Sequence, residues 1–158
     1  MRKNKIELTV GVLETGELSS ADSRLRAAAI RAAGRAYAPY SHYSVGAAVL
    51  LSDGTIVEGN NQENVAYPSG LCAERVALFY AGASYPEIPV VSVAIVAVKD
   101  GEIQESVSPC GACRQVLLET ERRYGKPVRI LMCGRDEAFV ISSAEDLLPL
   151  SFNIENIR

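Results

Sequence analysis

The stretch SGLCAERVALF, residues 69–79, has a cysteine and, two residues later, a glutamate at the start of an apolar run. A second stretch, SPCGACRQVLLE at residues 108–119, has two more cysteines at the start of another apolar run. Each run is long enough to predict a helix, and each predicted helix begins where the thiols stand. The chemistry of the chain is therefore expected at these two helix starts.

The other segments alternate between predicted strands and helices. Residues 20–38 are rich in alanine, with apolar residues at helical spacing, and predict a helix capped by Ser20. Residues 45–60 predict a hairpin around a turn at residues 52–54. Three more strands are predicted at residues 90–98, 127–134 and 138–143, and a short helix at residues 143–149.

This alternation predicts a layered α/β domain around a mixed sheet of five strands. The first 19 residues are interpreted as an N-terminal arm, within which residues 6–14 alternate enough for a short edge strand. The predicted organisation is thus an arm over residues 1–19 and a single catalytic domain over residues 20–158, ending in a tail.

Length and composition narrow the functional classes. The chain has 158 residues with a formal net charge of -3, and it lacks a block rich in lysine or arginine, so a nucleic-acid partner is not expected. The N-terminus lacks a secretory apolar region, and no apolar run approaches the length of a membrane span. A cytoplasmic protein without a membrane partner is expected, in which four cysteines bind metal, catalyse or lie buried.

Three cysteines are candidates for one metal site. Cys110 and Cys113 form a Cys-x-x-Cys pair at a helix start, and Cys72 would reach them from the other helix. Three thiolates suit zinc, which prefers four ligands, so one position is left for water as in catalytic zinc sites. Arg75 and Arg114 adjoin these cysteines, and at least one is expected to donate a hydrogen bond to a ligand sulfur and offset its charge.

Glu74 could take a proton from that water and pass it to a substrate nitrogen. Other interpretations stay open at this point. A Cys-x-x-Cys pair can be redox-active or structural, and Glu74 can simply favour the helix dipole. Cys133 could close a structural site of four cysteines, although a buried position on a strand is expected for it. His42 could also be a ligand, although its surroundings predict an exposed turn.

The order Cys-Ala-Glu and then Pro-Cys-x-x-Cys resembles the zinc-dependent nucleoside deaminases. A cysteine as the first ligand is similar to the small homotetrameric cytidine deaminases. The resemblance extends over residues 37–152 and includes five segments in the same order: PYSHYSVGAAV, NQENVAY, LCAER, SPCGACRQVL and DLLPLSF.

The resemblance implies a three-layer α/β/α fold, one zinc ion per subunit on the three cysteines, and Glu74 as the proton shuttle. It also implies a homotetramer with shared active sites. It implies these substrate contacts: Asn61 and Glu63 on the ribose hydroxyl, Tyr67 closing the loop over the substrate, the Ala73 N–H beside the base carbonyl, Tyr43 beside the substrate, and Phe152 stacking on the base from a neighbouring subunit. A simpler interpretation is that Asn61 and Glu63 only fix a loop.

The implied reaction is the hydrolysis of cytidine and 2'-deoxycytidine to uridine and 2'-deoxyuridine with release of ammonia, in pyrimidine salvage. The same cysteine pattern allows three competing functions. A deaminase of a nucleoside antibiotic such as blasticidin S shares the cysteine pattern, but Glu63 argues against it. An editing deaminase of RNA or DNA is disfavoured by the acidic chain. The third is a non-catalytic zinc module with Cys133 as fourth ligand.

Overall fold

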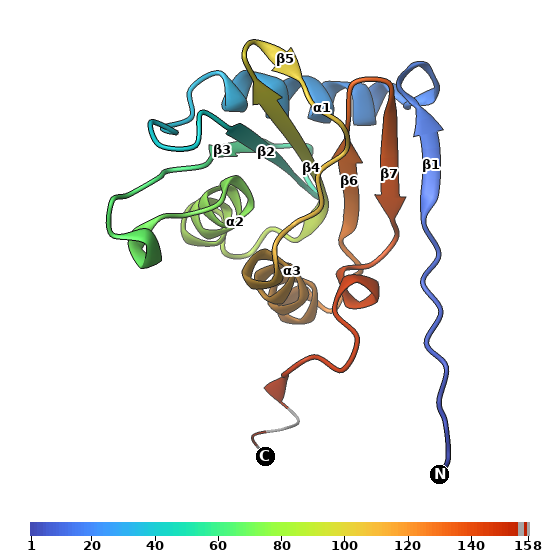
Figure 1. Cartoon of the computed structure of the whole chain (residues 1–158). Helices are drawn as coiled ribbons and strands as arrows, with labels where there is room; N and C mark the ends of the chain where they lie inside the picture. Colours follow the sequence, from blue (N-terminus) through green and yellow to red (C-terminus); the bar gives the residue numbers. More distant parts are fainter. Residues whose placement is uncertain (155–156, 158) are drawn as a thin grey trace.

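A computed structural model describes residues 1–154 and 157, so part of the predicted C-terminal tail (residues 155, 156 and 158) lies outside the described residues. The helices and strands follow one another as shown in Figure 1. The helices are α1 (Ser20–Ala33), α2 (Ala73–Ser84) and α3 (Gly111–Tyr124). The strands are β1 (Gly11–Glu14), β2 (Ser44–Leu51), β3 (Ile56–Asn60), β4 (Val90–Lys99), β5 (Glu102–Ile103), β6 (Arg129–Cys133) and β7 (Glu137–Ile141).

The strands form one mixed sheet in the order β1-β7-β6-β4-β2-β3, with β5 paired to the end of β4. The β4–β6 pair is parallel and the other pairs are antiparallel, which confirms the predicted mixed sheet. The five predicted strands correspond to β2, β3, β4, β6 and β7. The described sheet has two more: β5, with only two residues, is too short for a sequence pattern, and β1 pairs with β7 only over Gly11–Glu14.

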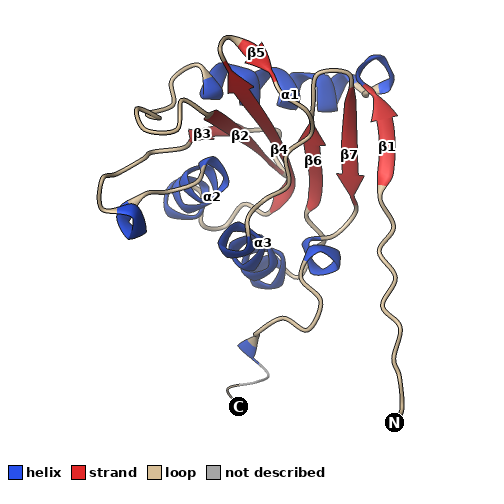
Figure 2. Cartoon of the chain, in the orientation of Figure 1, coloured by secondary structure: helices blue, strands red, loops and turns tan. Residues whose placement is uncertain are grey.

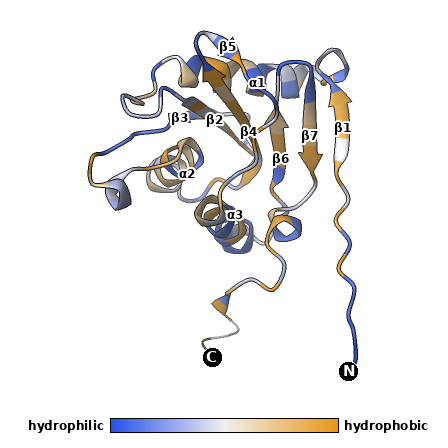
Figure 3. Ribbon diagram, in the orientation of Figure 1, coloured by the Kyte–Doolittle hydropathy of each residue, from blue (hydrophilic) through white to orange (hydrophobic). Residues whose placement is uncertain are grey.

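Helices cover the sheet on both faces, which confirms the three-layer α/β/α arrangement. Helix α1 lies on one face, while α2 and α3 lie side by side on the other (Figures 1 and 2). The strands that lie between these layers are predominantly apolar (Figure 3). Buried side chains accordingly form two clusters, one on each face of the sheet.

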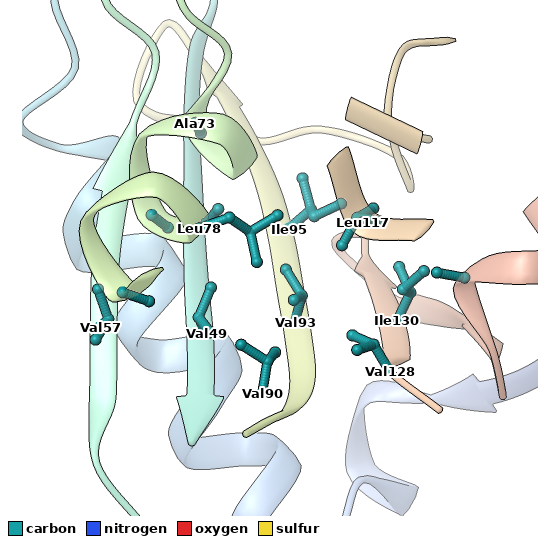
Figure 4. Close-up of a cluster of buried hydrophobic side chains, with 14 of the residues drawn as sticks. Val49, Val57, Ala73, Leu78, Val90, Val93, Ile95, Leu117, Val128 and Ile130 are labelled. Carbon is teal, nitrogen blue, oxygen red and sulfur yellow. The ribbon is translucent and has the colours of Figure 1, made fainter. Parts of the chain in front are cut away.

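The larger cluster fills the space between the sheet and helices α2 and α3. It includes Val93 and Ile95 of β4 together with Leu117 of α3, all 1% exposed or less (Figure 4). Each such side chain stabilises the fold by about 1.5–3 kcal/mol relative to an exposed one. This packing holds the two helices in a fixed position on the sheet, and their N-termini with them.

Strand β6 shows how side chains divide between the two faces. Ile130 and Met132 belong to the cluster under α2 and α3, whereas Leu131 and Cys133 belong to the cluster under α1. Successive side chains on a strand point to opposite faces, so Cys133 lies across the sheet from the helix starts that carry the other cysteines.

The helix ends differ from the sequence expectation in detail. The N-cap of α1 is Ser19, whose hydroxyl accepts a hydrogen bond from the Asp22 N–H at 3.1 Å, and not Ser20, which is the first helical residue. Helix α1 ends at Ala33 instead of residue 38, because residues after Gly34 turn to pair Tyr37 with Gln62. The predicted short helix near residue 144 is a 3₁₀ helix, Ala144–Leu147.

The N-terminal segment keeps its contact with the sheet beyond the end of β1. The Thr15 N–H donates to the Asp136 carbonyl at 2.8 Å and continues the contact of the N-terminal segment with β7. The division into an arm and a domain at residue 19 stays a prediction.

Within residues 1–154 and 157, no helix combines the length and apolar character needed to cross a membrane.

Gly59 of β3 sets how closely α2 approaches the sheet. A Cβ at this position would lie 2.4 Å from the Ala77 backbone nitrogen and 2.7 Å from the Ala73 carbonyl oxygen. Both contacts are with the backbone of α2, which cannot move aside as a flexible side chain can. The absence of a side chain at Gly59 therefore fixes the first turn of α2, on which Glu74 stands.

Gly59→Ala is expected to destabilise the fold, because a methyl group would push α2 away from β3. An overpacked contact of this kind costs ~1–3 kcal/mol and should lower the melting temperature by roughly 3–10 °C. Gly16→Ala is the control, since a Cβ there meets nothing within 4 Å. Differential scanning calorimetry of both variants checks this; equal melting temperatures would show that α2 does not depend on the close approach.

Candidate active site

Three sulfur atoms meet where α2 and α3 begin. Cys72 is the N-cap residue of α2, Cys110 is the N-cap residue of α3, and Cys113 lies in the first turn of α3. The Cys72 and Cys110 sulfurs are 3.7 Å apart, and the Cys110 and Cys113 sulfurs are 3.5 Å apart. All three lie within 4.8 Å of one another.

These distances fit one zinc ion. Sulfurs at about 2.3 Å from zinc with tetrahedral angles would be ~3.8 Å apart, close to both measured separations. The helix starts also favour thiolates, because unpaired backbone N–H groups and the positive end of each helix dipole lower thiol pKa values. The three cysteines therefore have the spacing and the surroundings of a zinc site that lacks a fourth protein ligand.

Charge around the cluster is distributed unevenly. The neighbouring Cys113 thiol and then the Arg75 guanidinium lower the pKa of Cys72 to about 5. The pKa of Cys113 is raised, first by its hydrogen bond to Cys72 and then by burial. Cys72 is thus the thiolate of this pair, and Arg75 is the cation that stabilises it.

The two arginines beside the cysteines make different contacts. Arg75 Nη2 donates to the Cys72 sulfur at 4.0 Å and to the Gly70 carbonyl at 3.5 Å. Arg114 donates instead to two backbone carbonyls, those of Pro109 at 2.9 Å and Leu147 at 3.1 Å. Arg75 therefore contacts a candidate ligand, whereas Arg114 joins the residue before Cys110 to the C-terminal 3₁₀ helix.

A cavity of about 620 Å³ opens beside the sulfur cluster. Its walls include seven residues that the sequence analysis selected: Asn61, Glu63, Tyr67, Cys72, Glu74, Arg75 and Cys110. Its remaining lining residues were not selected: Tyr40, Ser41, Val45, Gln62, Asn64, Gly70, Leu71, Ile95, Val107 and Ser108. Tyr40 and Ser41 lie inside the quoted segment PYSHYSVGAAV, so their position in that segment was the available signal.

Glu74 brings a carboxylate to the inner wall of this cavity. It lies in the first turn of α2 and its side chain is only 4% exposed. Burial, and next the charge of Cys72, raises the pKa of Glu74 above its ordinary value. A carboxyl group with a raised pKa beside a metal site is suited to accept a proton and return it.

Asn61 and Glu63 both contact the segment that leads into β2. The Asn61 side-chain oxygen accepts from the Val45 N–H at 2.8 Å, and its amide nitrogen donates to the Tyr43 carbonyl at 2.9 Å. The Glu63 carboxylate accepts from the Tyr40 N–H at 2.9 Å and from residue 41. The loop-fixing interpretation thus describes contacts that are present, and the same two side chains also line the cavity.

The remaining residues that the resemblance implies for substrate binding differ in whether they line the cavity. Tyr67 is at its rim and is 81% exposed. Ala73 is buried as the first residue of α2. Tyr43 is half-buried and is not among the residues that line the cavity. Phe152 is 64% exposed and also outside that set, and its carbonyl accepts from Gln115 at 3.1 Å.

The two alternative ligands do not join the cluster. The described residues contain one group of cysteine, histidine or acidic side chains spaced for a metal, and it is Cys72, Cys110 and Cys113. Cys133 is buried on the α1 face of the sheet, and burial raises its pKa to about 11. His42 lies in a turn with φ 55°, a conformation that non-glycine residues rarely adopt.

A buried carboxylate and three thiols at paired helix starts in an α/β/α fold define a zinc-binding deaminase class. Comparison with known proteins agrees. Residues 19–125 match the family described as the cytidine and deoxycytidylate deaminase zinc-binding region. The chain is 48% identical over 130 residues to a cytidine deaminase of Halalkalibacterium halodurans, covering 82% of this chain and 92% of that protein.

A cytidine deaminase of Mycobacterium tuberculosis is 40% identical over 136 residues, covering 84% of this chain and 90% of its own. A crystal structure of cytidine deaminase from Burkholderia pseudomallei superposes with a TM-score of 0.66 at 39% identity, covering 82% of this chain and 98% of that one. The chain therefore belongs to the cytidine and deoxycytidylate deaminase family and carries the zinc-binding region of that family.

The ligand set can be tested with matched substitutions. Cys110→Ala is expected to lose most bound zinc, because two sulfurs cannot hold the ion as three do. Cys133→Ala is expected to keep the zinc content of the unmodified protein, because Cys133 lies on the opposite face of the sheet. Atomic emission spectroscopy measures zinc per chain. Loss of zinc from a folded Cys133→Ala protein would contradict the three-cysteine site.

Proposed function

We propose that this protein hydrolyses cytidine and 2'-deoxycytidine to uridine and 2'-deoxyuridine, with release of ammonia. The observation that carries the proposal is a cluster of three thiols beside a cavity that is lined by two of them, Cys72 and Cys110, and by the buried Glu74. The cavity volume of about 620 Å³ is typical of a small-molecule site. The similarity to cytidine deaminases supports cytidine as the nucleoside to be deaminated.

The reaction adds water to C4 of the base and removes its amino group. Zinc held by Cys72, Cys110 and Cys113 would supply a water molecule whose pKa is lowered toward ~7. Glu74 takes the proton of this attacking water and delivers it to ring N3. Glu74 then takes the second proton from the new hydroxyl group on C4 and passes it to the amine, so that the C4 carbonyl forms as the C4–N bond breaks and ammonia leaves.

The first residues of α2 support the base on the other side. Ala73 begins the helix, and the first N–H groups of a helix have no partner within it. Its N–H is therefore available to donate to the carbonyl oxygen of the base. This contact would orient C4 toward the metal site, because Ala73 stands between Cys72 and Glu74.

Asn61, Glu63 and Tyr67 also line the cavity, and we place the sugar at this end, against these three residues. The Glu63 carboxylate can accept a hydrogen bond from a ribose hydroxyl, and Tyr67 can close over it from the rim. Tyr43 contributes to this end through its backbone carbonyl, which holds Asn61 in place. When the sugar is held in this way, C4 of the base is placed beside the metal site, which reduces the entropic cost of the reaction.

The proposal includes a homotetramer with shared active sites. The C-terminal segment carries exposed apolar side chains, with Leu150 at 95% and Phe152 at 64%. Large apolar side chains at such exposure favour burial against another surface. A neighbouring subunit would place Phe152 on the base, as the family resemblance implies.

We also propose a cytoplasmic location and a role in pyrimidine salvage. All four cysteines are free of disulfides, which suits a reducing compartment. Recovery of uracil nucleosides from cytosine nucleosides is the metabolic role that follows from the proposed reaction.

Glu74→Gln is expected to lower kcat by ~10²–10⁴-fold while zinc content stays unchanged, because the amide cannot accept a proton. An ultraviolet assay of cytidine loss, with and without a zinc chelator, measures the effect. Glu119→Gln, on the exposed side of α3, is the matched control and should keep full activity. An unchanged kcat in Glu74→Gln would remove Glu74 from the mechanism, and activity that survives zinc removal would contradict the metal's role.

Glu63→Ala is expected to raise KM for cytidine by ~10–100-fold with a smaller change in kcat, because it removes a charged acceptor for a sugar hydroxyl. Steady-state kinetics with cytidine and free cytosine as substrates test this. If the unmodified protein deaminates both with the same kcat/KM, the sugar contact does not exist.

A further inference from the structure

The Glu63 carboxylate is surrounded by donors from one short segment. One oxygen, Oε2, accepts from the Tyr40 N–H at 2.9 Å and from the Ser41 N–H at 3.3 Å. The other oxygen, Oε1, accepts from the Ser41 hydroxyl. The Ser41 oxygen in turn accepts from the Tyr43 N–H at 3.0 Å, which fixes the direction of the hydroxyl group.

These contacts leave the Glu63 carboxylate with few free positions to accept a hydrogen bond. An ionised carboxylate has about four acceptor positions on its two oxygens. The two backbone N–H groups occupy Oε2, and the Ser41 hydroxyl occupies half of Oε1. One acceptor position of Glu63 therefore remains for a ligand, and it lies on Oε1, the oxygen that Ser41 holds.

The location of this group suits a ligand contact. Ser41 and Glu63 both line the cavity, as do Cys72 and Cys110 of the candidate metal site. The Ser41 hydroxyl and next the Tyr40 N–H hold the pKa of Glu63 below its usual range, so the carboxylate is ionised at neutral pH. Two of its three donors belong to the backbone, so the Ser41 hydroxyl is the one that a substitution can remove.

We propose that Ser41 is a positioning residue for sugar recognition: its hydroxyl orients Glu63 Oε1 so that one acceptor position is presented to a hydroxyl group of the nucleoside sugar. The proposal rests on the proposed function. It predicts that Ser41 affects only substrates whose sugar carries that hydroxyl donor. A serine that merely stabilises the loop would affect all substrates equally.

The test compares Ser41→Ala and Ser41→Thr with the unmodified protein, using cytidine and 2',3'-dideoxycytidine as substrates. Ser41→Ala should raise KM for cytidine by roughly 3- to 10-fold, with kcat within about 2-fold, because one hydrogen bond to Glu63 is lost. Its KM for the dideoxy substrate should not change, and Ser41→Thr, which keeps a hydroxyl, should restore KM for cytidine. Melting temperatures of both variants monitor the fold.

A double variant shows whether Ser41 acts through Glu63. If it does, Ser41→Ala combined with Glu63→Ala should raise KM for cytidine no further than Glu63→Ala alone. Additive effects, or an equal rise of KM for both substrates, would overturn the proposal while the deaminase function stands. If the unmodified protein does not deaminate cytidine at all, the proposed function is wrong and this inference falls with it.

Discussion

The site depends on two helix N-termini that meet on one face of the sheet. Neither helix alone carries a complete set of ligands, because α2 supplies Cys72 and α3 supplies Cys110 and Cys113. Close packing holds the helices in place: α2 lies directly on β3 at Gly59, and apolar side chains of both helices pack with those of the sheet in one core. A shift of either helix by about an ångström would separate the sulfurs beyond the span of one zinc ion.

Bringing the two helix starts together also brings negative charges close to one another, and neighbouring positive charges reduce their repulsion. When all three cysteines are deprotonated to bind zinc, three thiolates and the Glu74 carboxylate stand close together in a partly buried place, where like charges repel strongly. Two helix dipoles, the Arg75 guanidinium and the zinc ion of this family oppose that repulsion. Because the ligands must be deprotonated, zinc binding releases protons and becomes weaker as the pH falls. Burial, and next the charge of Cys72, raises the pKa of Glu74, so a thiolate at this position also affects the group proposed for proton transfer.

The features that sequence predicted well are those with a local signal. The apolar runs of β4 and β6, the stop of α3 at Gly125 with φ 62° and the placing of cysteines at helix starts each depend on neighbours in the chain. What the sequence did not show depends on distant partners. The face on which Cys133 lies is decided by the layer that packs there, and β1 is a strand only where it pairs with residues 137–140 of β7. The contact of Ser41 with Glu63 joins residues 22 positions apart, and no local pattern announces it.

The two ends of the cavity are built on different kinds of support. The end with the candidate metal ligands stands on helix starts fixed by the core, whereas the end proposed for the sugar stands on a loop in which Asn61 and Glu63 accept hydrogen bonds from the Val45 and Tyr40 N–H groups. Both ends lie within residues 19–125, the region that matches the family, while β1 and Phe152 lie outside it. The residues proposed for the reaction and for the sugar contact therefore both lie in the shared region. Phe152, which we propose to reach the base from a neighbouring subunit, lies outside it, so that contact would depend on a flanking segment.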